Sequence, residues 1–238
     1  MWLVSNKILV KDSGIFERFC DYHCHLLPRV DDGVQEAEES FYILSQLESI
    51  GVEVVWLTPH IMGDIPNGTE DLKRRFEAFQ SAYTGQIELH LAAENMLDNL
   101  FMQRLKARDL LTFGIAGKHL LVETSYFNPP MDMEGIINKI QNAGYIPVLA
   151  HPERYQYMDM RYYINLKKSN VLFQLNIPSL IGAYGVEAQK KAEMLLAKRM
   201  YDCCGTDIHS ARHMDYMLNC KVSKKTAKAI KQIAKVLA

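Results

Sequence analysis

Residues 146–155 read IPVLAHPERY, an apolar run that stops abruptly at a histidine, a glutamate and an arginine. The run has the length and aliphatic content of a strand buried on both faces, as in a parallel sheet. The preceding residues, 131–143, have helical spacing and stop at Gly144, where glycine commonly closes a helix. A helix followed directly by a buried strand predicts one repeat of a βα fold.

The same alternation extends in both directions along the chain. Together with 146–151, the expected strands are 19–25, 52–58, 87–93, 120–123, 171–176 and 199–205. Together with 131–143, the expected helices are 35–50, 69–83, 162–169, 186–197 and 223–237, and 98–113 is expected to form a short helix with a connector. Seven strands with helices between them favour a single-domain α/β fold, a TIM-like parallel barrel.

The composition limits the classes of partner. The 238-residue chain has a net charge of −1 and 48% hydrophobic residues, so a large core is available and no basic excess favours nucleic acid. No segment has the uninterrupted apolar length of a membrane span, and the N-terminus lacks the features of a signal peptide. Five cysteines without a C-x-x-C pair argue against a disulfide scaffold or a zinc ribbon. We therefore expect a cytoplasmic protein that is not membrane-embedded.

Metal-binding residue types follow the strands one after another. His23 and His25 end the first strand two residues apart, so their side chains can reach one ion together. The other strand ends and the loop after the first strand add imidazoles and carboxylates. The full candidate set is His23, His25, Asp32, His60, Glu94, Glu123, His151, Asp207 and His209. In a barrel these ends meet at one face, and so much buried negative charge requires cations. Mixed nitrogen and oxygen ligands suit zinc, iron or manganese better than calcium.

Each candidate also has a structural explanation when taken alone. Asp31–Asp32–Gly33 is a turn signal, Glu123 could pair with an arginine, and Asp207 could cap a helix. Their shared position at strand ends favours the metal site. His90, His119 and His213 match no ligand position, and Cys24 should point away from its flanking histidines and pack in the core.

The order H-x-H, D-D-G, T-P-H, Glu, Glu, H-P-E-R-Y and D-x-H resembles the polymerase and histidinol phosphatase (PHP) superfamily. It is most similar to the bacterial PHP-type tyrosine-protein phosphatases of capsule and exopolysaccharide systems. The stretches that carry the resemblance are DYHCHLLPRVDDG at 21–33, TPH at 58–60, LAHPERY at 149–155, NIPSLIGAYG at 176–185 and GTDIH at 205–209. It covers 19–238 as one domain and leaves 1–18 as an N-terminal extension, expected to be a strand or an oligomer contact.

The resemblance implies a distorted (β/α)7 barrel of the PHP fold with two or three divalent metal ions. Manganese is the first expectation, with iron, zinc and magnesium as alternatives. One ion would be held by His23, His25, Glu94 and Asp207, a second by Glu94, Glu123 and His151, and a third by Asp32, His60 and His209. Arg154 would clamp phosphate, and Arg212 matches a second family arginine at a shorter spacing. Arg29 stands where the family commonly has glycine.

The resemblance also implies a reaction, the attack of a metal-activated hydroxide on the phosphorus of a phosphotyrosine protein. The substrate would be a bacterial tyrosine kinase that regulates capsule or exopolysaccharide synthesis. No cysteine is followed by an arginine at the C-x5-R spacing of cysteine-based tyrosine phosphatases, so no phosphocysteine is expected.

Three other functions remain open at this point. Histidinol phosphatase, or another PHP phosphoesterase, would use the same residues. An amidohydrolase-like metal hydrolase shares the H-x-H motif and the barrel. A non-catalytic, metal-binding partner of a kinase would need the fold without turnover.

Overall fold

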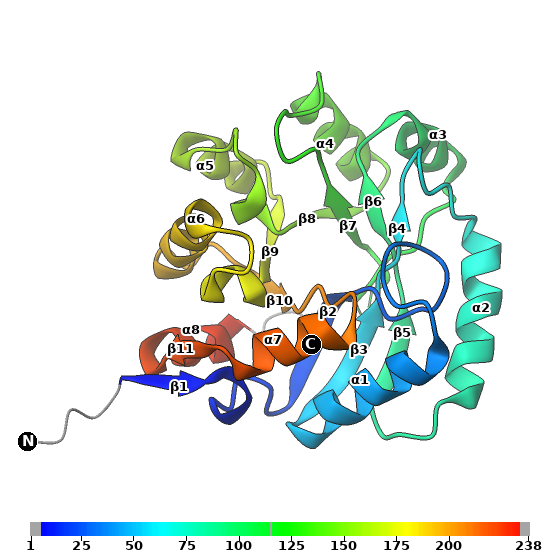
Figure 1. The fold of residues 1–238 in the computed structure, drawn as a ribbon. Coiled ribbons are helices and arrows are strands. Elements are labelled where there is room, and N and C mark those ends of the chain that lie inside the picture. The colour runs from blue at the N-terminus through cyan, green and yellow to red at the C-terminus, as the bar shows by residue number, and fades with distance from the viewer. Residues whose placement is uncertain (1–5, 115, 234–238) are drawn as a thin grey trace, which may run out of the picture.

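The computed structural model describes residues 6–114 and 116–233 and has a ring of parallel strands surrounded by helices (Figure 1). The strands of this ring form two parallel sheets. The smaller sheet has the order β2-β3-β5 and the larger has the order β10-β9-β8-β7-β6-β4. The strands of the smaller sheet are β2 (Phe19–Cys24), β3 (Val52–Leu57) and β5 (Glu88–Leu91). Those of the larger sheet are β4 (His60–Ile61), β6 (Glu94–Met96), β7 (His119–Glu123), β8 (Ile146–Ala150), β9 (Leu172–Asn176) and β10 (Cys203–Gly205).

Two predicted strands are each followed by a short strand in the other sheet. The expected strand 52–58 is observed as β3 and is followed by β4, and the expected strand 87–93 is observed as β5 and is followed by β6. Pro59 lies at the first break and has no N–H to continue a ladder. The Glu94 N–H instead donates to the Pro59 carbonyl at 3.1 Å. The two predicted strands are therefore confirmed, and the short strands β4 and β6, which continue them around the ring, were missed.

The other edges of the two sheets meet just beyond β2 and β10. The Asp207 N–H donates to the His23 carbonyl at 2.7 Å, and the His25 N–H donates to the Ile208 carbonyl at 2.9 Å. These hydrogen bonds join the first and last strands at their carboxyl ends. The structure is thus a mixed α/β domain with a strongly curled parallel sheet.

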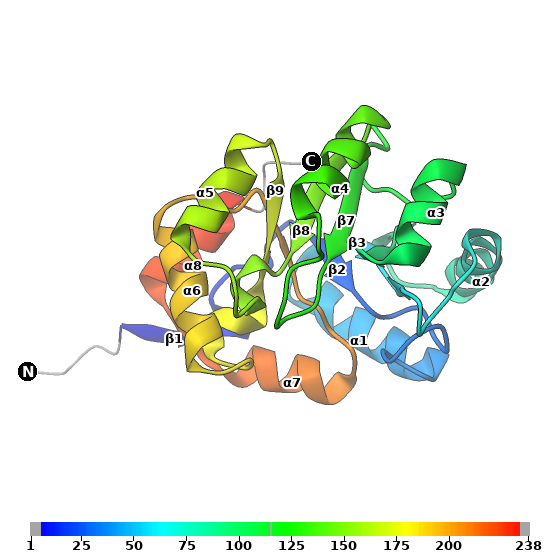
Figure 2. The same cartoon turned by 90° about the horizontal axis from the view of Figure 1, so that it is seen from above.

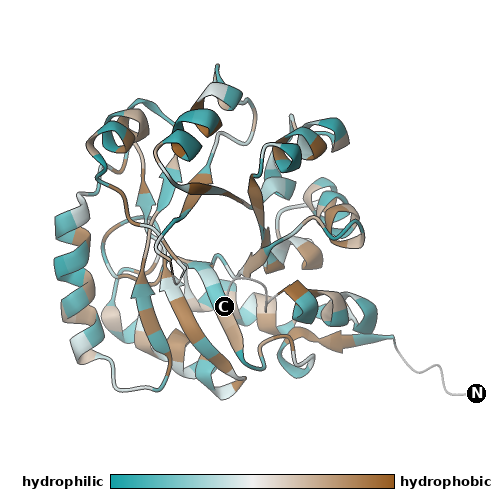
Figure 3. Ribbon diagram, turned by 180° about the vertical axis from the view of Figure 1, so that it is seen from behind, coloured by the Kyte–Doolittle hydropathy of each residue, from teal (hydrophilic) through white to brown (hydrophobic). Residues whose placement is uncertain are grey.

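The helices cover the outside of this ring. They are α1 (Ala37–Ser49), α2 (Thr69–Ala82), α3 (Asn99–Ala107), α4 (Met133–Asn142), α5 (Met160–Lys168), α6 (Val186–Ala197), α7 (Ala211–Asn219) and α8 (Lys224–Ile233), with 3-10 turns η1 (Val10–Asp12), η2 (Pro152–Arg154) and η3 (Ile177–Ile181). Figure 3 shows apolar strands inside and helices with mixed faces outside. Ile136, Ile137 and Ile140 of α4, for example, are buried, and each contributes about 1.5–3 kcal/mol of hydrophobic stabilisation.

The predicted helices agree with the observed ones within a few residues, and the short helix with a connector at 98–113 is confirmed as α3. The predicted last helix is α8; its final residues, 234–237, lie outside the described part. Helix α7 was missed. Its signal is a serine cap followed by apolar residues at helical spacing, because Ser210 accepts from the His213 N–H while Met214, Met217 and Leu218 are buried.

The described part of the N-terminal extension packs against the C-terminal region. Strand β1 (Lys7–Leu9) pairs antiparallel with β11 (Lys221–Ser223), next to α8 (Figure 2). Val10, Ile15 and Phe16 are buried in the main core. Residues 6–18 are thus integrated with the domain. Among the described residues, none of the helices is long and apolar enough to cross a membrane.

Glu153, in η2, is a buried acid whose protonation affects stability. Its carboxyl group accepts from the Asn176 N–H at 3.0 Å and the Tyr201 hydroxyl at 2.9 Å. Burial nevertheless raises the pKa of Glu153 to about 7. Because the folded protein holds this proton more tightly than the unfolded chain, the stabilisation is complete at low pH and is lost as pH rises through about 7.

We therefore predict that Glu153→Gln reduces the loss of stability between about pH 5 and pH 8. The measurement is the free energy of unfolding in urea, with chelator present so that bound metal does not contribute. Glu77→Gln, at an exposed position of α2, is the control and should keep the pH dependence of the unchanged protein. An identical pH dependence in all three proteins would contradict the role given to Glu153.

Candidate metal centre

The nine candidate ligands lie at one end of the ring of strands. His23 is in β2, His25 and Asp32 follow it, Glu123 ends β7, His151 follows β8, and Asp207 and His209 follow β10. His60 and Glu94 begin β4 and β6, directly after the breaks beyond β3 and β5. Eight of these side chains are buried or half-buried, and Asp32 forms the exposed edge of the cluster with a side chain 66% exposed.

The H-x-H pair and two carboxylates make the first close group. His23 Nε2 and His25 Nε2 are 3.1 Å apart, so both rings face the same side. Each of these nitrogens lies 3.5 Å from Asp207 Oδ1, and they lie 3.1 and 3.4 Å from Glu94 Oε2. Four ligand atoms therefore converge on one point between β2 and the segment after β10.

A second group forms on the other side of Glu94. His60 Nδ1 lies 3.1 Å from Glu94 Oε2 and 3.0 Å from Glu123 Oε1. All three atoms are buried, yet their angles do not allow hydrogen bonds and they have no other hydrogen-bond partner. Buried polar atoms without partners are costly, and a cation between them would remove that cost.

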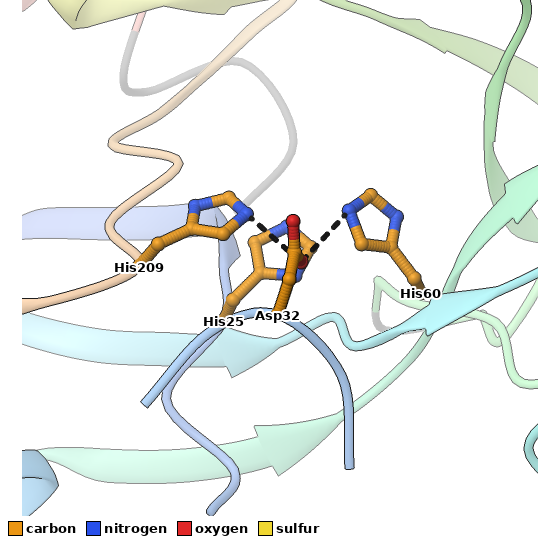
Figure 4. A group of neighbouring side chains, drawn as sticks. All are labelled: His25, Asp32, His60 and His209. Carbon is orange, nitrogen blue, oxygen red and sulfur yellow. Dashed lines mark ion pairs between the residues drawn. The ribbon is translucent and has the colours of Figure 1, made fainter. Parts of the chain in front are cut away.

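The third group is the most exposed and is drawn in Figure 4. Asp32 lies between His60 and His209, with its Oδ1 at 3.5 Å from the Nε2 atom of each ring. The His25 ring is stacked on His209 behind this carboxylate, with centroids 4.0 Å apart. His60 thus offers one nitrogen to this group and the other to Glu94 and Glu123.

His151 takes a different position from the one that the resemblance implied. Its Nε2 lies 2.9 Å from Glu94 Oε1 and groups with His23 and Glu94. Glu123 has His60 as its close imidazole instead. The nine side chains are therefore gathered, and the close groups around Glu94 pair His151 with His23 and Glu123 with His60.

The charges within the cluster compensate one another. Burial opposes charge on His23, but Glu94 and Asp207 outweigh it and raise the pKa of His23 to about 9. Burial also opposes charge on Glu94, yet His23 and His60 hold its pKa well below the ordinary range. Burial and the nearby Arg154 lower the pKa of His151 to about 4, so this ring is neutral near pH 7. Metal ions would take over the role of the protons on His23 and release them.

Neighbouring polar groups fix which nitrogen of each histidine faces the cluster. Gln174 Oε1 accepts from His23 Nδ1 at 3.0 Å, and Asp31 Oδ2 accepts from His25 Nδ1 at 2.8 Å. The Asp207 carbonyl accepts from His209 Nδ1 at 2.9 Å. All three rings thereby turn Nε2 inward. Metal-binding histidines are commonly oriented in this way, with the other ring nitrogen donating to a carboxylate, carbonyl or amide oxygen. The sequence prediction missed Gln174 and treated Asp31 only as part of a turn signal.

Close packing and backbone strain also shape the site. A Cβ at Gly33 would lie 2.3 Å from the His25 carbonyl oxygen, and one at Gly205 would lie 2.4 Å from His23 Cβ, so only glycine fits at either position. His151 and Asp207 adopt positive φ values of 34° and 53°, which are uncommon for residues with side chains and concentrate at functional sites. Arg29 also has a positive φ, 61°, which accounts for the preference for glycine at that position.

A cavity of about 370 Å³ opens above the cluster, and Arg154 lines it. The guanidinium lies between two aromatic rings, with Cζ 4.5 Å from the Tyr126 centroid and 4.0 Å from the Tyr184 centroid. Its Nη1 donates to Asp207 Oδ2 at 2.8 Å. A planar guanidinium held in this way can present donors to an anion that enters the cavity.

Two residues differ from their sequence-based assignments. Arg212 is exposed on α7 and is not among the described residues that line the cavity. The assignment of Arg212 to the site therefore rests on the resemblance alone. His213, which was set aside, does line the cavity beside Tyr184. Cys24 is buried in the core as predicted, and His90 and His119 lie outside the cavity lining.

The donor set fits divalent metal ions. The buried atoms His60 Nδ1, Glu94 Oε2 and Glu123 Oε1 converge without hydrogen bonds. The groups that can hold an ion contain imidazoles and carboxylates and no cysteine. Such sets suit zinc, iron or manganese.

Known proteins resemble this chain over most of its length. It is 24% identical over 202 residues to the tyrosine-protein phosphatase YwqE of Bacillus subtilis, covering 82% of this chain and 79% of that protein. It is 24% identical over 213 residues to the tyrosine-protein phosphatase CpsB of Streptococcus agalactiae, covering 80% and 82%.

A solved structure shares the fold. It comes from the crystal structures of YwqE from Bacillus subtilis and CpsB from Streptococcus pneumoniae, described as metal-dependent tyrosine phosphatases. The match has a TM-score of 0.70 at 22% identity and covers 89% of this chain and 85% of the other.

A family profile described as "Capsular polysaccharide synthesis, CpsB/CapC" matches residues 19–236, which is nearly all of the predicted barrel and its ligand set. This chain is therefore a member of the CpsB/CapC family of capsular polysaccharide synthesis.

Proposed function

We propose that this protein is a metal-dependent protein-tyrosine phosphatase, a phosphoric monoester hydrolase. The observation that carries the proposal is the convergence of His60 Nδ1, Glu94 Oε2 and Glu123 Oε1, buried and without hydrogen bonds, below a cavity that Arg154 lines. Cations below and a guanidinium above would surround an anion in that cavity with positive charge. The named activity of the relatives supports phosphotyrosine as the substrate.

The metal ions in this proposal are two or three, with manganese as the first choice and iron, zinc and magnesium as alternatives. The ligands assigned are His23, His25, Asp32, His60, Glu94, Glu123, His151, Asp207 and His209. Glu94 would take part in holding more than one ion, because its two oxygens face different neighbours. When bound, the metals supply Lewis-acid charge and lower the pKa of a water molecule toward neutrality.

The chain's own residues bind and orient the phosphate. Arg154 donates two parallel N–H groups to phosphoryl oxygens, which fixes the ester in line for attack. The rings of Tyr126 and Tyr184 hold the guanidinium plane, so little side-chain entropy is lost when phosphate binds. The leaving group of a tyrosine ester is a phenolate with a pKa of about 10, which departs more easily than an alkoxide.

The proposal includes a distorted (β/α)7 barrel as the architecture. Its support is that β3 with β4 and β5 with β6 each act as one strand of the ring, which together with β2, β7, β8, β9 and β10 makes seven.

The proposed partner is a cytoplasmic tyrosine kinase domain that regulates capsule or exopolysaccharide synthesis. Family membership supports the pathway. The five cysteines are all unpaired, as is usual in a reducing compartment.

We predict that chelation abolishes activity and that manganese restores it. The ligands converge on positions that only cations can occupy without penalty, so EDTA should remove turnover of a phosphotyrosine peptide, and added Mn²⁺ should recover it. Iodoacetamide should change the rate by less than about twofold, because the Cys24, Cys203 and Cys204 thiols are buried with raised pKa values. Circular dichroism of each sample controls for unfolding. Activity that survives EDTA but not alkylation would contradict the proposal.

We predict that Arg154→Ala lowers kcat/KM on a phosphotyrosine peptide by about 10²–10³-fold, and that Arg154→Lys recovers only part of this loss. The reason is the removal of a two-donor contact with the phosphoryl group. Metal content, measured by elemental analysis, should stay close to that of the unchanged protein. Arg74→Ala on the exposed face of α2 is the control, and Arg212→Ala should cost far less than Arg154→Ala. Equal losses of kcat/KM in Arg154→Ala and Arg212→Ala would contradict the smaller role expected for the exposed Arg212.

We predict a preference for aryl over alkyl phosphates. The value of kcat/KM for a phosphotyrosine peptide should exceed that for histidinol phosphate by about 10²-fold, since the phenolate departs more easily and the cavity has tyrosine walls. A preference for histidinol phosphate would make the chain another phosphoesterase of the superfamily. No turnover of either ester by protein that contains metal would favour the amidohydrolase or the non-catalytic alternative.

A further inference from the structure

The two tyrosines that flank Arg154 are each followed by an exposed apolar side chain. Phe127 directly follows Tyr126 and is 64% exposed, and Val186 lies two residues after Tyr184 and is also 64% exposed. Met131, further along the loop that carries Phe127, is fully exposed. We call Phe127, Met131 and Val186 the apolar lip.

The base of the loop that carries Phe127 and Met131 is anchored. This loop, 124–132, joins β7 to α4. The Thr124 hydroxyl and the Tyr157 hydroxyl are hydrogen-bonded at 2.6 Å, and the Gln156 N–H donates to the Tyr126 carbonyl at 2.8 Å. Two consecutive prolines before Met131 further restrict the backbone. The loop therefore holds its apolar side chains in solvent while its base is fixed.

The opposite side of the lip is anchored to the metal cluster. The Tyr184 hydroxyl donates to Asp207 Oδ2 at 3.2 Å, and Val186 begins α6. Because both tyrosine rings contact the same guanidinium, the loops after β7 and β9 border one cavity. Figure 2 shows these loops on the side of the ring where α7 lies. The residues of the apolar lip therefore follow, along the chain, the two tyrosines that line the cavity on either side of Arg154.

This inference rests on the function proposed above. For a phosphotyrosine substrate, the position of the apolar lip indicates which part of the substrate would contact it. A phosphate group beside Arg154 lies inside the cavity, so the tyrosine that carries it spans the cavity and its backbone lies at the mouth. The residues on either side of that tyrosine then lie beside the lip. The one charged residue of this loop, Asp132, accepts from the Gly135 N–H at the start of α4, and residues 124–131 are uncharged. This side of the mouth therefore suits apolar rather than acidic neighbours.

We propose that the apolar lip binds hydrophobic side chains next to the phosphotyrosine of a polypeptide substrate. The lip then selects among phosphotyrosine sequences, while the cavity and the metal centre act on the phosphate. A small phosphomonoester fills the cavity without reaching the lip.

The test compares two variants and three probes on protein loaded with manganese. The probes are a phosphotyrosine peptide flanked by leucines, one flanked by serines, and p-nitrophenyl phosphate. The unchanged protein should prefer the leucine peptide by about tenfold in kcat/KM. The double variant Phe127→Ser, Met131→Ser should lose this preference, and its turnover of p-nitrophenyl phosphate should be unchanged.

Ile146→Ser is the matched control. Ile146 is also an exposed apolar residue, but it begins β8, whereas His151 follows the other end of that strand. This variant should keep the peptide preference.

Three results would overturn the proposal: equal rates on the two peptides with the unchanged protein, a preserved preference in the double variant, or a parallel loss on p-nitrophenyl phosphate. A dimer of the unchanged protein that the double variant dissociates, seen by size-exclusion chromatography, would assign the lip to a second copy of the chain instead. Hydrolysis of p-nitrophenyl phosphate without a peptide preference would contradict only the role given to the apolar lip. No hydrolysis of any of the three probes would contradict the proposed phosphatase function itself.

Discussion

The structure depends on the compensation of one fully buried carboxylate. Glu94 has its two oxygens within 3.1 Å of His23, His60 and His151, which come from three different strand ends. A carboxylate without access to water is costly unless positive charge or hydrogen bonds surround it. The break between β5 and β6 brings Glu94 to the point where the two sheets adjoin. The positive charge that compensates Glu94 is therefore needed both where the two sheets adjoin and in the candidate metal site.

Residues outside the cluster make that arrangement rigid. Gln174 orients His23 and also accepts from the His151 N–H at 3.2 Å, so one amide holds two strands and two candidate ligands. Asp207 is divided in the same way, with Oδ1 toward the histidines and Oδ2 toward Arg154, Asn176 and Tyr184. The metal cluster and the phosphate-binding arginine are thus connected through one side chain. Asp207 therefore couples metal binding to the position of Arg154, which is proposed to bind the phosphate.

Much of the fold and the candidate site could be predicted because parallel strands bring their carboxyl ends together. An apolar run such as 146–150 fixes the direction of a strand, so the place of His151 follows from its position in the chain. The close contact of His60 with Glu123 could not be predicted, because it depends on which nitrogen of His60 faces that carboxylate. The place of His213 in the cavity lining follows from the path of α7, a helix whose short signal was missed. The positive φ values of His151 and Asp207 could not be predicted, because the spacing of residue types along the sequence does not reveal backbone torsion angles.

The most direct test of the central claim is a crystal structure of protein loaded with Mn²⁺, with anomalous scattering data to locate the ions. The account predicts peaks within coordination distance of the oxygens of Glu94, with one peak also next to Asp207 and the H-x-H pair. The His60, Glu94 and Glu123 side chains should turn toward ions rather than toward one another. Well-ordered Glu94, His60 and Glu123 side chains with no anomalous peak between them would contradict it.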